Sequence, residues 1–84
     1  MYRINPKVLQ TPVTDGNILL LEPEKGLYYE LNDTSVMIFQ AIENGMDRDG
    51  IARLIISNYE IDEKTAQADI DILIGLLMDN NIIY

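Results

Sequence analysis

The sequence contains neither cysteine nor histidine among its 84 residues. Disulfides, thiolate or imidazole metal sites, and both Ser–His–Asp and Cys–His catalysis are therefore excluded. Carboxylates remain, but Asp69 and Asp71 lie two positions apart on a predicted helix and so point in different directions. Residues 47–50 lack the later ligands of a calcium loop. The sequence thus predicts a protein that is not an enzyme and that needs no metal or cofactor.

Basic residues are also few, with six Lys and Arg against 14 Asp and Glu, for a formal net charge of −8. The bases are scattered along the chain, so the surface repels phosphate backbones and anionic lipid. Apolar runs such as residues 18–21 are far too short to span a bilayer, and the N-terminus has no signal-peptide pattern. We therefore expect a protein that binds neither nucleic acid nor membrane. We also expect it to be cytoplasmic, because a chain without cysteine suits a reducing compartment.

The first third of the chain has the pattern of an antiparallel meander. Residues 3–14 read as an extended segment that two of the three prolines interrupt, which places this strand at a sheet edge. Asp15-Gly16 suits a tight hairpin turn with positive φ. Residues 17–22 are apolar on both faces, as in a central strand, and residues 27–31 alternate with period two. Short turns between them predict three strands paired in sequence order.

The remaining two-thirds of the chain is predicted to be helical. Asn32, Asp47 and Asp62 are good N-caps, and each lies between an apolar residue before it and another four positions after it. Gly45 suits the end of the first helix. The predicted helices span about 33–44, 48–58 and 63–80. The expected fold is a single α+β domain over residues 1–84, a three-stranded antiparallel meander followed by three α-helices, an order that permits a winged helix-turn-helix-like arrangement.

The two outer strands of this meander differ in how their edges are protected. Pro6, Lys7 and Pro12 blunt the first strand, whereas the third has neither proline nor lysine between Leu27 and Asn32. An unprotected edge can accept a peptide as an added strand. The third helix has an apolar face wider than its neighbours require, which supplies walls for such a peptide. The predicted binding residues are Tyr28, Tyr29, Glu30, Leu31, Asp69, Ile72, Leu73 and Leu76. From the residues alone, an edge covered by the third helix or by a second copy of the chain is as consistent as an open edge that accepts a peptide.

Residues spread over nearly the whole chain also resemble a known family. They are Asp15-Gly16, Leu20-Leu21, Gly26, Tyr28, Leu31-Asn32, Asn44-Gly45, Ile51, Tyr59, Asp69-Ile70, Leu73 and Leu77. This pattern resembles the PqqD-like family, the D-type proteins of pyrroloquinoline-quinone biosynthesis, also known as RiPP recognition elements. The likeness is greatest to the short stand-alone proteins of lasso peptide biosynthesis.

The resemblance implies a specific function. A family member binds the leader peptide of a ribosomally made precursor as a fourth strand beside the third, against the third helix, and delivers it to a processing enzyme such as a leader peptidase. Quinone-pathway members commonly carry a cysteine before the glycine that ends the first helix, where this chain has Asn44. Two alternatives remain open: a PqqD-type chaperone in quinone cofactor biosynthesis, and a structural domain that dimerises through the same strand edge.

Overall fold

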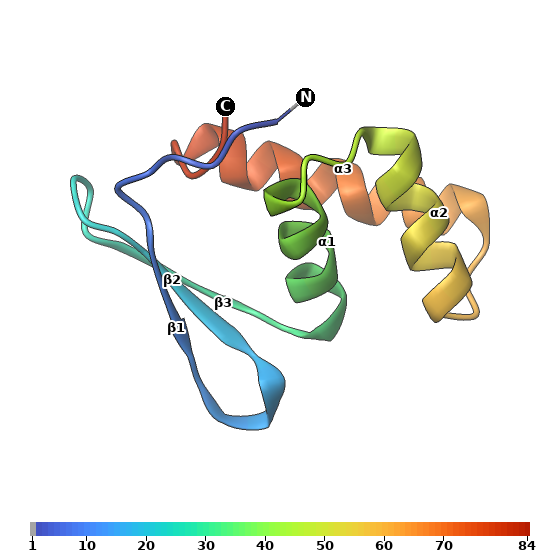
Figure 1. The fold of residues 1–84 in the computed structure, drawn as a ribbon, viewed down its shortest axis with the longest axis horizontal. Helices are drawn as coiled ribbons and strands as arrows, with labels where there is room; N and C mark the ends of the chain where they lie inside the picture. Colours follow the sequence, from blue (N-terminus) through green and yellow to red (C-terminus); the bar gives the residue numbers. More distant parts are fainter. Residues whose placement is uncertain (1) are drawn as a thin grey trace.

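The computed structural model describes residues 2–84 and contains the predicted elements in the predicted order (Figure 1). Three strands come first, and a short 3-10 turn separates the first two; three helices follow. The elements are β1 (Leu9–Pro12), η1 (Thr14–Gly16), β2 (Ile18–Glu22), β3 (Leu27–Leu31), α1 (Asp33–Glu43), α2 (Arg48–Asn58) and α3 (Glu63–Asp79). The α+β class and the strand-then-helix order are thereby confirmed.

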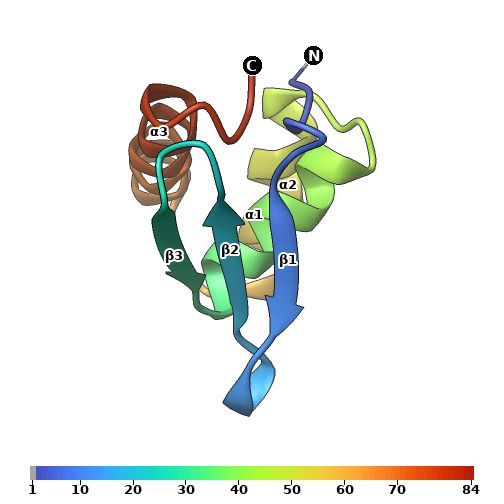
Figure 2. The ribbon, with the colours of Figure 1, turned by 90° about the vertical axis from the view of Figure 1, so that its left-hand side faces the viewer.

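The sheet is antiparallel with the order β1-β2-β3, so the meander prediction is confirmed (Figure 2). The period-two alternation of residues 27–31 is also confirmed: Leu31 is buried and Tyr29 packs partly buried against the core, whereas Tyr28 and Glu30 are exposed. The β1 prediction was too long, because only four residues pair with β2. The hairpin loop is also longer than a tight two-residue turn, since pairing stops at Pro12 and Ile18, although Asp15 and Gly16 do have positive φ.

The three helices begin at the predicted caps. The side chains of Asn32, Asp47 and Asp62 accept hydrogen bonds from backbone amides three residues further on, at 3.4, 2.8 and 2.8 Å. These bonds satisfy amides that have no partner within the helix. At the end of α1, Gly45 takes a left-handed conformation (φ 78°), and the amide of Met46 donates to the carbonyl of Ala41 at 3.0 Å. Local sequence therefore sets the start of each helix and the stop of α1.

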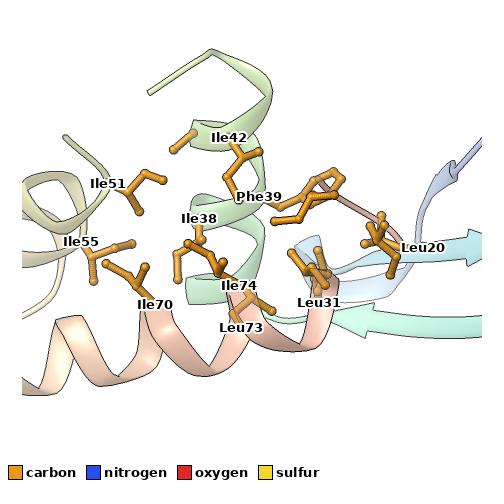
Figure 3. Close-up of a cluster of buried hydrophobic side chains, with 14 of the residues drawn as sticks. Leu20, Leu31, Ile38, Phe39, Ile42, Ile51, Ile55, Ile70, Leu73 and Ile74 are labelled. Atoms are coloured by element: carbon orange, nitrogen blue, oxygen red, sulfur yellow. The ribbon is translucent and has the colours of Figure 1, made fainter. Parts of the chain in front are cut away.

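The core lies where the inner face of the sheet meets the three helices (Figure 3). Phe39 of α1 is completely buried and lies between Leu20 and Leu31 of the sheet and the aliphatic side chains of the helices. The side chains that α3 contributes to this core are Ala66, Ile70, Leu73, Ile74 and Leu77. Burial of these side chains is the main force that holds the sheet on the helices.

The two ends of the chain pair with each other. Asn81 has positive φ (60°) and turns the chain after α3, so that Ile82 and Ile83 become buried. Arg3 and Tyr84 exchange two backbone hydrogen bonds, at 2.7 and 2.8 Å. The start of the predicted first strand therefore pairs with the C-terminal tail instead of with β2. None of the described helices is both long and apolar enough to cross a bilayer.

Candidate functional site

An open groove lies between the beginning of α1 and one face of α3. It encloses about 340 Å³. Its lining combines apolar residues with hydroxyl, amide and carboxylate groups: Asn32, Thr34, Ser35, Ile38, Asp69, Ile72, Leu73 and Leu76. An apolar pocket with a few polar groups is typical of a binding site.

The α3 wall of this groove follows directly from helical spacing. Asp69, Ile72, Leu73 and Leu76 occur at positions i, i+3, i+4 and i+7, which share one face of a helix. Leu73 is buried in the core, but Ile72 is 71% exposed and Leu76 is 40% exposed. The expectation of an apolar face broader than the packing of the described residues requires is therefore confirmed. Exposed neighbouring aliphatic side chains in a groove mark a surface that a partner can cover.

The outer edge of β3 leads into the same groove. β3 is an edge strand among the described residues, and Asn32, which follows it, is part of the groove lining. In Figure 2, α3 lies on the same side of the molecule as β3. On the opposite edge, β1 ends with Pro12. In the folded sheet, one edge strand thus carries a proline that hinders further pairing, and the other does not.

The two faces of β3 have different surroundings. Tyr28 and Glu30 pair with Leu21 and Leu19 on the outer face, where Tyr28 is 66% exposed. The carboxylate of Glu30 accepts a hydrogen bond from the side-chain amide (Nδ2) of Asn17, at 2.9 Å. Tyr29 and Leu31 point toward the core instead. A peptide bound at this edge therefore has one side that faces the core and the helices, and one open outer side where Tyr28, Glu30 and their leucine partners lie.

Asp69 is the one charged side chain among the described residues that line the groove. Asp69 is exposed and forms no ion pair with the described residues, and no lysine or arginine lines the groove. Asp71 is engaged elsewhere, because Arg48 binds its carboxylate at 2.5 Å and also donates to Gln67. The prediction that the two aspartates point in different directions is thus confirmed. The free carboxylate of Asp69 favours a peptide that carries a hydrogen-bond donor or a positive charge.

The structure brings together only part of the residue set predicted from sequence. The four residues from α3 line the groove, whereas the four from β3 form the strand that leads to it and are not part of its lining. Sequence reasoning missed the α1 wall, which Thr34, Ser35 and Ile38 supply. A signal was present in the N-cap at Asn32, because a cap fixes the direction in which the first turn of a helix faces.

Glu22 is a further residue that sequence reasoning missed. Its side chain is 1% exposed, and its two carboxylate oxygens accept from the amides of Glu24 and Lys25, at 3.1 and 2.8 Å. These bonds hold the turn that joins β2 to β3. Within residues 2–84, no three acidic side chains lie close enough together to hold a metal ion. The geometry offers a strand edge and a groove beside it, which suit binding of an extended chain.

Comparison with known proteins gives a consistent result. A family model described as "Coenzyme PQQ synthesis protein D (PqqD)" matches residues 17–83. Among solved structures, a lasso peptide synthetase B1 complexed with the leader peptide is 29% identical, with a TM-score of 0.88 over 99% of this chain and 96% of that one. TbiB1 in complex with the TbiA(beta) leader peptide shares the fold, at 22% identity and a TM-score of 0.86 over 96% and 93% of the two chains. No curated protein is similar enough in sequence to count as a match.

Proposed function

The chain belongs to the PqqD family, and from this membership we propose that it recognises the leader peptide of a ribosomally synthesised precursor of the lasso type. The similar lasso peptide synthetase B1 was solved with a leader peptide, and its fold matches this chain over nearly the full length of both. The groove and strand edge described above lie in the part of the chain that the family model covers. Recognition of a leader accounts for an open binding surface on a chain with no His or Cys for chemistry.

The leader binds by strand addition to β3. The observation that carries this mechanism is the edge of β3 without proline or lysine, which continues through Asn32 into the groove lined by the exposed Ile72. Backbone hydrogen bonds to the edge supply affinity that does not depend on sequence. The leader side chains that face α3 contact Ile72, Leu73 and Leu76, and those contacts supply specificity. Tyr28, Tyr29, Glu30 and Leu31 contribute the strand, and Asp69 meets a polar or cationic group of the leader.

The protein acts as an adaptor and carries out no covalent chemistry itself. It holds the leader in an extended form and presents the rest of the precursor to a maturation enzyme such as a leader peptidase. Raising the local concentration of precursor at that enzyme is sufficient to accelerate processing. This account places the partner enzyme on a surface that remains exposed when the groove is filled.

A binding measurement with matched variants of α3 tests this proposal. The probe is a fluorescein-labelled leader peptide of a lasso precursor, and its binding is measured by fluorescence polarisation. Ile72→Ala removes an exposed groove side chain, so the fold should persist while Kd rises by about tenfold, the effect of roughly 1.4 kcal/mol. Met78→Ala is the control, because Met78 is exposed on the same helix but does not line the groove. Equal effects of the two substitutions contradict the proposed site.

Pairing of two copies through the same edge is the competing function that an open strand favours. Light scattering after size-exclusion chromatography separates the two accounts. A monomer that stays monomeric when leader binds supports recognition. A dimer that the leader cannot dissociate supports the structural role.

A further inference from the structure

The alternation of hydrogen-bonded and non-hydrogen-bonded residue pairs in the sheet determines which backbone groups of β3 are free at its edge. In an antiparallel pair, residues alternate between those that exchange backbone hydrogen bonds and those that do not. The amide of Val13 donates to the carbonyl of Asn17 at 3.0 Å, so β2 residues at odd positions bond to β1. The even positions of β2 therefore bond to β3, and their partners there are Leu27, Tyr29 and Leu31.

The backbone groups of the remaining β3 residues, Tyr28 and Glu30, consequently point away from β2. Both residues retain their amides, so the edge presents two donors and two acceptors in line. By the same alternation, the outward positions on β1 are Gln10 and Pro12, and proline has no amide to offer. This pattern explains why β1 tolerates Pro12: the backbone nitrogen at that position faces away from β2, so no hydrogen bond within the sheet needs a proton there.

We propose that Tyr28 and Glu30 form a two-residue backbone clamp that fixes the register of the bound leader, an inference that rests on the proposed function. The visiting strand runs antiparallel, as do the other pairs in this sheet. Two of its residues, separated by one, exchange hydrogen bonds with Tyr28 and Glu30. Because directly paired residues share a face, the side chains of those two residues lie on the open outer face.

The same register assigns the other leader side chains to the groove. The residue between the two clamped ones lies opposite Tyr29, and the next on one side lies opposite Leu31 at the mouth of the groove. These side chains face α3, so they meet Ile72 and Leu76 and should be apolar. The substrate class is therefore an extended segment with apolar residues at alternate positions, whereas the residues between them face the open outer side and are less restricted. Next to Glu30 a basic residue is favoured on the outer face, by charge.

Proline substitution in β3 tests the clamp from the protein side. Tyr28→Pro and Glu30→Pro each remove an outward amide, so the sheet should persist while leader Kd rises by about tenfold, as for one lost hydrogen bond of roughly 1.4 kcal/mol. Tyr28→Ala and Glu30→Ala control for loss of the side chains. Tyr29→Pro removes a bond to β2 and should unfold the chain, measured by circular dichroism. Folded Tyr29→Pro, or folded Glu30→Pro with unchanged affinity, overturns the clamp.

Amide methylation of the ligand tests it without altering the fold of the protein. Peptides are first selected by mRNA display of a random library on the immobilised full chain, and each amide of the best binder is then N-methylated in turn. Two sensitive amides separated by one tolerant residue, with apolar side chains at the intervening position, support the clamp. Binding without this alternation, or with apolar residues at the sensitive positions, overturns it. Failure to select any extended peptide instead refutes the proposed function itself.

Discussion

The buried carboxylate of Glu22 should be one of the largest single polar contributions to stability in this protein. It is fully shielded from solvent and accepts two hydrogen bonds from the turn between β2 and β3. A hydrogen bond to a charged group contributes about 1.5–3 kcal/mol, and a buried amide left without a partner costs a comparable amount. Both amides here are part-buried. We therefore take the lower value for each and expect Glu22→Ala to reduce the free energy of unfolding by about 3 kcal/mol.

This loss is large enough to measure and small enough to leave a folded protein. For a domain of this size, 1 kcal/mol lowers Tm by about 4–8 °C, so Glu22→Ala should lower it by roughly 12–24 °C. Glu22→Gln keeps one acceptor oxygen and replaces the other with a donor, and its effect should be about half as large. Thermal and urea melts followed by circular dichroism give both values.

Glu24→Ala is the matched control, because it removes an acid from the same turn. Glu24 forms an exposed ion pair with Lys7, which solvent screens. Its removal should change Tm very little. If Glu22→Ala and Glu24→Ala have the same small effect, the two turn amides are satisfied by water and the reasoning about burial is wrong.

Three further predictions concern the core, α3 and acid stability. Leu31→Ala should lower the free energy of unfolding by about 3 kcal/mol, since Leu31 is 3% exposed. Tyr29→Ala should lower it by less, because Tyr29 is only partly buried. Urea melts that show no loss of stability would contradict the assignment of both side chains to the inner face of β3. Gly75→Ala should add about 0.5–1 kcal/mol, because a methyl group there meets open space within a helix; a lower Tm would refute this. Hydrogen bonds from the side chain and backbone of Thr65 lower the pKa of Asp62 below its usual 3.8, so its stabilising effect is complete above that pH and is lost as pH falls through the lowered value. Asp62→Asn should therefore flatten the acid limb of the stability profile between pH 7 and 2, and an unchanged limb would remove Asp62 from that account.

Much of the fold was predictable because its signals are local. The caps at Asn32, Asp47 and Asp62, and the glycine after α1, each act within a few residues of the sequence, and the structure confirms all of them. The order of the strands followed from short turns and from alternation of apolar residues. The broad apolar face of α3 also followed from helical period alone.

The features that escaped prediction depend on contacts distant in sequence. Glu22 looks like a polar strand end, and only the closure of the turn over it makes it buried. The start of the first predicted strand does not pair with β2, because it pairs with the C-terminal tail instead. Ile4 bridges to Ile83, which lies 79 residues away in the sequence. The α1 wall of the groove could not be assigned without the angle between α1 and α3. The β3 residues whose backbone groups are free at the edge could be identified only from the hydrogen-bond pattern of the sheet, because composition does not reveal that pattern.

The pairing of Arg3 with Tyr84 also determines how the molecule can be handled. The N-terminal segment lies near Ile42 and Glu43, at the C-terminal part of α1, and Tyr84 pairs with it there, whereas the groove begins at the other end of that helix (Figure 1). Eleven helical residues separate these regions by about 16 Å. A tether on either terminus thus leaves the strand edge facing solution. A force that pulls the termini apart would open this pairing one bond at a time, and Ile82 and Ile83 would be the first buried side chains to meet water.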